Sequence, residues 1–99
     1  FQIIDQVGSP NVKVVFDIYH QQISEGQLIA NIKANIDKIA HFHAAGNPGR
    51  NELTSGELHY PSIFDAIRDC DFDGYVGLEY WPLKEASAGL REIATWFRD

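Results

Sequence analysis

The sequence contains no methionine and begins at Phe1, so we expect a fragment or a processed chain. Its single cysteine, Cys70, cannot form an internal disulfide bond, which is consistent with a reducing compartment. No apolar run approaches the roughly 18 residues of a membrane span, and the first residues lack the pattern of a signal peptide. We therefore predict a cytoplasmic protein that has no membrane segment.

Basic residues are also scarce. Eight lysines and arginines face fourteen acidic residues, which gives a formal charge of −6. Such a charge repels phosphate backbones and anionic membrane surfaces, so we expect neither nucleic acid nor a membrane as a partner. The hydrophobic content of 44% suits a globular core, and 99 residues suffice for one domain at most.

The apolar residues alternate between strand-like and helix-like patterns along the chain. Residues 1–7 look like the end of a helix, which Gly8 closes as a C-terminal cap. The other expected elements are strands over 12–16, 39–44 and 75–80, helices over 24–36 and 86–97, and a helix that begins near Pro61. A long loop rich in Gly, Asn and Pro precedes this helix, and loops of that length are usually functional.

Two of the expected helices carry more detailed signals. Ser24 can cap the helix over 24–36, and Gln27 stands where it could complete a capping box, although Gly26 weakens this prediction. The apolar side of that helix would consist of Leu28, Ile29, Ile32 and Ile36. The inward side of the last helix would consist of Leu90, Ile93, Ala94 and Phe97.

Strands that alternate with helices predict an α/β fold with a parallel sheet and right-handed crossovers. Three strands cannot close a barrel, and their open edges require partners. We therefore expect residues 1–99 to form a single partial domain, which either self-associates or relies on a missing part.

Ligands of parallel α/β proteins bind at the carboxyl ends of the strands. Those positions hold Asp17, with His20 three residues later, then His43 and Glu79. His41 and His43 should lie on the same face, because side chains alternate along a strand. Two carboxylates and an imidazole suit a divalent metal ion, with Mg²⁺ or Mn²⁺ as the first expectation and Co²⁺ or Zn²⁺ as alternatives.

Each of these residues also has a simpler interpretation. Asp17 could merely cap or turn the chain after its strand, and His20 or His41 could be a partly buried histidine bonded to a backbone carbonyl. Glu79 is harder to explain in this way, because a carboxylate in a buried strand requires a cation, a proton or several donors.

The long loop contributes further charged residues. Arg50 and Glu52 could form an ordinary solvated surface pair, but Arg50 could instead orient an oxygen-rich substrate through forked hydrogen bonds. Glu57 is interpreted as a loop charge, and Trp81 either packs or forms the rim of the site. No nucleophile motif or phosphate-binding glycine loop is present, so a metal beside a carboxylate and a histidine indicates proton transfer next to a carbonyl.

Four segments resemble the hydroxypyruvate isomerase family, which belongs to the xylose isomerase-like TIM barrels together with the ketose 3-epimerases. They are Phe-Asp-Ile-Tyr-His over 16–20, the stretch over 41–52, Gly-Glu-Leu-His-Tyr-Pro over 56–61 and Gly-Leu-Glu-Tyr-Trp-Pro over 77–82. The resemblance covers nearly the whole chain in one order. It implies the C-terminal part of a (β/α)8 TIM barrel, with about three βα units that correspond to strands six to eight.

The resemblance also implies residue roles. Asp17, His43 and Glu79 would bind the metal ion, and Glu79 would in addition be a catalytic acid/base. His20 and Arg50 would hold the oxygens of a small carbonyl substrate. The family has a further glutamate on strand five, both ligand and acid/base, which has no counterpart in these 99 residues.

The activity implied by the resemblance is the metal-dependent isomerisation of hydroxypyruvate to tartronate semialdehyde through an enediolate. His43 stands where hydroxypyruvate isomerases often carry glutamine and the sugar epimerases carry histidine, so a ketose 3-epimerase or related sugar isomerase is the alternative. A non-catalytic fragment for ligand binding or assembly is a further alternative. The abasic-site endonucleases of the same superfamily are disfavoured by the acidic charge.

Overall fold

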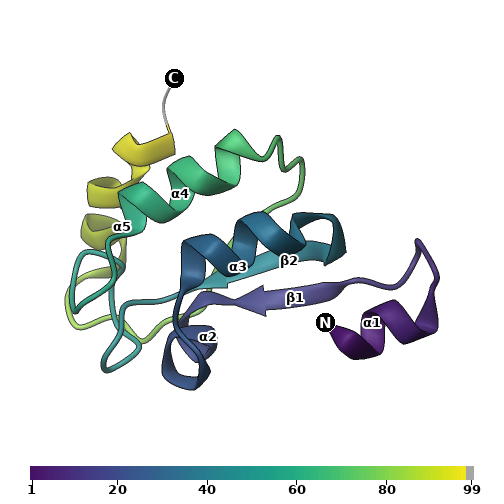
Figure 1. Cartoon of the computed structure of the whole chain (residues 1–99). Helices are drawn as coiled ribbons and strands as arrows, with labels where there is room; N and C mark the ends of the chain where they lie inside the picture. The colour runs from purple at the N-terminus through teal and green to yellow at the C-terminus, as the bar shows by residue number, and fades with distance from the viewer. Residues whose placement is uncertain (98–99) are drawn as a thin grey trace.

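The computed structural model describes residues 1–97, which form a three-stranded sheet with helices between the strands (Figure 1). The strands are β1 (Val14–Asp17), β2 (Ile39–Ala44) and β3 (Val76–Leu78). They lie in the order β1-β2-β3, and both pairs are parallel. The α/β class predicted from the alternating patterns is therefore confirmed.

Within residues 1–97, five α-helices accompany the sheet. They are α1 (Gln2–Val7), α2 (Ile18–Ser24), α3 (Leu28–Asn35), α4 (Tyr60–Asp69) and α5 (Ala86–Ala94). Short 3-10 turns follow α3 at Ile36–Lys38 and α5 at Thr95–Phe97. In Figure 1, α3 and α4 run along one face of the sheet, while α1 lies apart, toward the end where β1 begins.

The core fills the space between the sheet and helices α3 and α4. Phe42 on the central strand is fully buried, and its ring lies 5.7 Å from that of Phe16 and 4.9 Å from that of Phe72. Side chains from the helices close the core from above, among them Ile32, Ile63, Phe64 and Ile67. Each such side chain contributes about 1.5–3 kcal/mol when it leaves water, so this layer holds the strands that carry the site.

The boundaries predicted for the helix over residues 24–36 are wrong. Ser24 is the last residue of α2, and its hydroxyl donates to backbone carbonyls of that helix. Gly26 and Gln27 then take left-handed conformations, with φ of 68° and 46°, and α3 begins only at Leu28. Two successive residues of positive φ cannot continue a right-handed helix, so the chain makes two short helices where we expected one.

The final helix is also less buried than its pattern predicts. Ile93 is buried as expected, but Leu90, Ala94 and Phe97 are exposed. Trp96 packs against the core instead. No helix among the described residues is both long enough and apolar enough to cross a membrane.

Candidate metal centre

Strand register brings the predicted ligands to one end of the sheet. Asp17, the last residue of β1, pairs with His43 on β2, and His43 in turn pairs with Gly77 on β3. Glu79 follows β3 directly, and its backbone N–H donates to the carbonyl of Ala44. The three ligand candidates therefore meet at the carboxyl ends of three neighbouring strands, as the sequence predicted.

The side chains converge on one point. His43 Nδ1 lies 2.7 Å from Glu79 Oε2 and 3.9 Å from Asp17 Oδ2. One potential ligand atom from each of Asp17, His43 and Glu79 lies within 4.8 Å of the others. A single divalent cation at ligand distances of about 2.0–2.4 Å can contact three atoms so spaced, and the oxygen and nitrogen donors suit it chemically. The residues present therefore fit a metal ion, and the role of each as a ligand stays a prediction.

Asp17 combines two roles that its sequence position allows, a helix cap and a candidate metal ligand. Its Oδ1 accepts the backbone N–H of His20 at 3.0 Å and caps α2, while Oδ2 faces His43. The cap lets one carboxylate oxygen hold the helix start while the other stays available to a cation. Only 19% of the Asp17 side chain is exposed, so its neighbours restrict how it can turn.

His41 lies beside His43 on the same face of β2, as alternation predicts. The two rings meet edge to face, with centroids 5.0 Å apart. Gly77 leaves the space for both, because a Cβ there would lie 3.0 Å from His41 Nε2 and 3.3 Å from His43 Cδ2. The His41 ring is therefore a packing neighbour that limits how the His43 ring can turn.

Glu79 differs from its expected environment. The strand predicted over 75–80 is observed only over 76–78, so Glu79 lies just beyond it. Its side chain is 52% exposed, because β3 is the edge of this sheet. The inference that Glu79 needs a partner because it is buried is therefore wrong for these residues, although the partners themselves are present.

Arg50 reaches the site from the long loop between β2 and α4. Its Nη2 lies 3.0 Å from Glu79 Oε1 and 3.7 Å from Asp17 Oδ2, and its guanidinium lies 5.2 Å from the centre of the Tyr19 ring. Arg50 has φ of 59°, an uncommon conformation for a residue other than glycine. The simple surface pair of Arg50 with Glu52 is not observed, because Arg50 points toward the cluster instead.

His20 is exposed in the first turn of α2, and its ring packs edge-on against the Tyr19 ring at 5.2 Å. Its backbone, rather than its imidazole, contacts the cluster through Asp17. His20 thus lies beside the cluster, and its contact with a substrate stays a prediction.

Glu52 was interpreted as half of a solvated surface pair with Arg50, and this interpretation is wrong. Its side chain is buried, and its carboxylate accepts the backbone N–H groups of Leu83 at 3.0–3.1 Å and Lys84 at 3.2 Å. Loss of solvation alone would raise the pKa of Glu52, but these backbone donors and the Lys84 ammonium together hold it below the ordinary value of 4.5. The one signal in the sequence is Leu53, an apolar residue inside a polar loop, which indicates that this part turns inward.

Tyr60 is a second residue that the sequence did not single out. Its hydroxyl accepts the N–H of Ala45 at 3.0 Å and donates to the carbonyl of Ala45 at 2.7 Å. Burial raises the pKa of Tyr60 well above its ordinary value of 10.0. The phenol is therefore neutral and holds the backbone two residues beyond His43.

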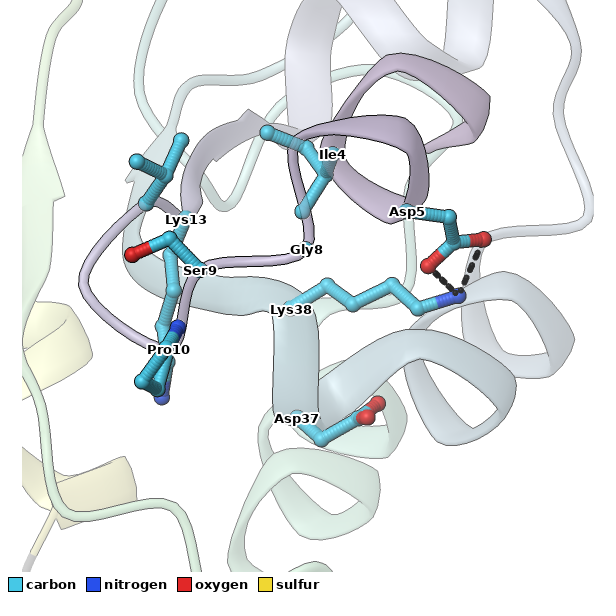
Figure 2. A pocket seen from close by; sticks show the side chains of 9 residues that line it. Ile4, Asp5, Gly8, Ser9, Pro10, Lys13, Asp37 and Lys38 are labelled. Carbon is cyan, nitrogen blue, oxygen red and sulfur yellow. Dashed lines mark hydrogen bonds and ion pairs between the residues drawn. The ribbon is translucent and has the colours of Figure 1, made fainter.

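Two cavities lie at opposite ends of the sheet. One of about 420 Å³ is lined by Arg50, Leu78, Glu79, Tyr80 and Trp81 beside the cluster. The other, of about 470 Å³, lies between the end of α1 and the turn before β2 (Figure 2). Figure 2 shows the Lys38 ammonium paired with the Asp5 carboxylate in the wall of this cavity. This ion pair joins α1 to the turn before β2, so we interpret it as structural.

Curated relatives of this chain are isomerases. It is 43% identical to a hydroxypyruvate isomerase of Escherichia coli over 91% of this chain and 35% of that protein. It is 44% identical to a 2-oxo-tetronate isomerase of Cupriavidus necator over 89% of this chain and 34% of that protein. The chain therefore spans about a third of the length of these relatives.

Solved structures match the fold equally well. A protein from Brucella melitensis, described as an AP endonuclease of family 2, superposes with a TM-score of 0.91 at 36% identity, over 99% of this chain and 38% of that one. A 3-keto-D-glucoside 4-epimerase of E. coli superposes with a TM-score of 0.85 at 28% identity, over 97% of this chain and 37% of that one. The three βα units are thus part of a TIM barrel.

The pattern of the xylose isomerase-like TIM barrel family matches residues 1–99. Together with the parallel sheet and the polar cluster at its carboxyl end, this match confirms the resemblance seen in the sequence. This chain belongs to the xylose isomerase-like TIM barrel family.

Proposed function

We propose that the protein containing this chain is a metal-dependent isomerase that interconverts hydroxypyruvate and tartronate semialdehyde. The observation that carries the proposal is the convergence of Asp17, His43 and Glu79 beside Arg50, in a chain 43% identical to a hydroxypyruvate isomerase. The cluster provides a place for a cation and a carboxylate next to a basic side chain. These are the groups that proton transfer beside a carbonyl requires.

Asp17, His43 and Glu79 would hold the ion, and a bound divalent cation would stabilise negative charge that develops on the substrate oxygens. The Glu79 carboxylate accepts a proton from the hydroxyl-bearing carbon of the substrate, or returns one, since Glu79 lines the cavity and half of its side chain is exposed. Arg50 binds the substrate carboxylate through its guanidinium fork. His20 orients a substrate hydroxyl from the start of α2.

The test is an assay of the full-length protein with hydroxypyruvate and with a set of ketoses, after loading with Mg²⁺ or Mn²⁺. Proton NMR in deuterated water follows both product formation and exchange of the transferred hydrogen. Conversion of hydroxypyruvate with metal-dependent turnover supports the proposal. Metal-dependent turnover of ketoses without any conversion of hydroxypyruvate contradicts the proposal.

A ketose 3-epimerase or related sugar isomerase is the second candidate. His43 favours it, because the resemblance assigns histidine at this position to the sugar epimerases. The superposition on the 3-keto-D-glucoside 4-epimerase supports it at the level of the fold. An endonuclease activity, which the description of the Brucella protein suggests, is less well supported because this chain carries a formal charge of −6.

The partner that we propose for this chain is the remainder of a barrel. Apolar side chains on the sheet and its flanking segments are exposed, including Val15 at 56%, Tyr75 at 79% and Trp81 at 73%. Such surfaces are usually covered by another element, either further strands of the same chain or a second copy. Sedimentation of residues 1–99 alone should reveal self-association, and a stable cooperative monomer would contradict this expectation.

A further inference from the structure

Glu79 is held both by strand β2 and by the loop that carries Arg50. Before it, the N–H of Glu79 itself donates to Ala44 at the end of β2. After it, the N–H of Trp81 donates to the carbonyl of Arg50 at 2.8 Å, and Asn51 Nδ2 donates to the carbonyl of Trp81 at 2.9 Å. The short segment around Glu79 is thus bound to the same loop along most of its length.

The strongest part of this attachment is Glu52. Both of its carboxylate oxygens accept from the backbone of Leu83, and one also accepts from Lys84. Charge-assisted bonds of this kind are about twice as strong as neutral ones, and Glu52 is only 4% exposed, so water competes poorly for them. Gly89 on α5 lies over the carboxylate side chain, since a Cβ there would be 3.2 Å from Glu52 Cγ.

We propose that Glu52 is a positioning residue, which holds Glu79 against Arg50 and His43 by anchoring the segment that follows Glu79. The inference rests on the proposed function only for its catalytic consequence, because the anchoring itself is a matter of backbone contacts. Glu52 touches neither the cavity beside the cluster nor any of the three ligand candidates. Its carboxylate instead binds the backbone of Leu83 and Lys84, so the Glu52 side chain acts on the site through residues 79–84.

The experiment is a double-mutant cycle in the full-length protein with E52Q, E79Q and the double variant. Glutamine keeps the size of Glu52 but replaces one acceptor oxygen with a donor that faces N–H groups. The first readout is Mn²⁺ affinity, measured by electron paramagnetic resonance. The second is hydrogen exchange at the amides of residues 81–84. Neither readout requires turnover, so a failure of the proposed isomerase activity would be seen separately.

The expected results are faster exchange over residues 81–84 in E52Q and an affinity for Mn²⁺ that falls about tenfold, as for other groups that orient metal ligands. In the E79Q background, E52Q should change the affinity by less than about twofold, because the ligand that it positions is already altered. The matched control is E57Q, an exposed carboxylate of the same loop, which should leave both readouts unchanged.

Two results would overturn the proposal. Additive effects of E52Q and E79Q on Mn²⁺ affinity would mean that Glu52 only stabilises the fold. Unchanged amide exchange over residues 81–84 in E52Q would mean that its hydrogen bonds do not hold this segment.

Discussion

The two ends of this small sheet are built in opposite ways. At the carboxyl end, the loop between β2 and α4 buries the polar side chains of Asn47 and Glu52 and binds the segment after β3. At the amino end, helix α1 buries none of its residues and is held by an exposed ion pair and by the stacking of Phe1 on Phe16. Buried polar contacts are costly unless they are satisfied, so their concentration at one end indicates where geometry matters most.

The backbone of the two regions differs accordingly. A Cβ at Gly46 would lie only 2.2 Å from the carbonyl oxygen of Glu52, so the loop closes tightly on itself just beyond β2. After α1, a Cβ at Gly8 would lie 3.9 Å from its nearest neighbour, the carbonyl oxygen of Asp5, and Pro10 and Lys13 line the pocket there (Figure 2). Changes at the carboxyl end should therefore disturb the site strongly, and changes at the amino end should be tolerated.

The largest effect is expected for H43A in the full-length protein. Loss of the central imidazole removes one of three converging ligand candidates, so Mn²⁺ affinity should fall by at least about 100-fold. Isothermal titration with Mn²⁺ measures this. H59A, which removes an exposed histidine before α4, should bind Mn²⁺ normally. Unchanged affinity in H43A would refute the assignment of His43 as a ligand.

A smaller but clear loss of stability is expected for Y60F. The substitution removes both hydrogen bonds of the phenol and leaves the N–H and carbonyl of Ala45 buried without that partner. The free energy of unfolding should fall by about 1–3 kcal/mol, as measured by urea denaturation. Y75F, whose residue is 79% exposed, is the control and should change it little. Equal stability of Y60F and the parent would show that β2 does not depend on this bond.

The pH dependence of stability should reveal the contribution of the ionised Glu52 carboxylate. Because its pKa is lowered in the folded state, its contribution is present above pH 4.5 and is lost as the pH falls through the lower, folded value. The parent should therefore exceed E52Q in urea midpoint at pH 7, and the difference should shrink as the solution is acidified below pH 4.5. A difference that stays constant from pH 7 to pH 3 would contradict the ionised, anchored carboxylate.

The smallest effect is expected for K38A at the amino end. Its ion pair with Asp5 is partly exposed, with Nζ to oxygen distances of 3.0 and 3.1 Å. Exposed pairs contribute about 0–1 kcal/mol, so the urea midpoint should barely move and Mn²⁺ affinity should not change. A loss as large as that of Y60F would mean that the two ends of the sheet are equally constrained.

Much of this arrangement could be predicted from local patterns. The strand over residues 39–44 has the predicted bounds, and Gly8 caps α1 in the left-handed conformation that was expected. The positions of Asp17 and His43 at the ends of their strands follow from strand periodicity and from the parallel order of the elements. These features depend on residues that are close in the sequence, so local patterns predict them.

The sequence by itself thus determined the order of strands and helices, the end of the sheet where the ligand candidates lie and the family to which the chain belongs. Only the tertiary structure decided that Glu52 is buried, that Arg50 turns toward Glu79 and that Gly77 makes room for two histidine rings. The contacts of Glu52 with Leu83 join residues 31 positions apart, and no local pattern carries such a distance. Backbone donors have no sequence signature of their own, so a carboxylate that binds them is recognised only after the chain has folded.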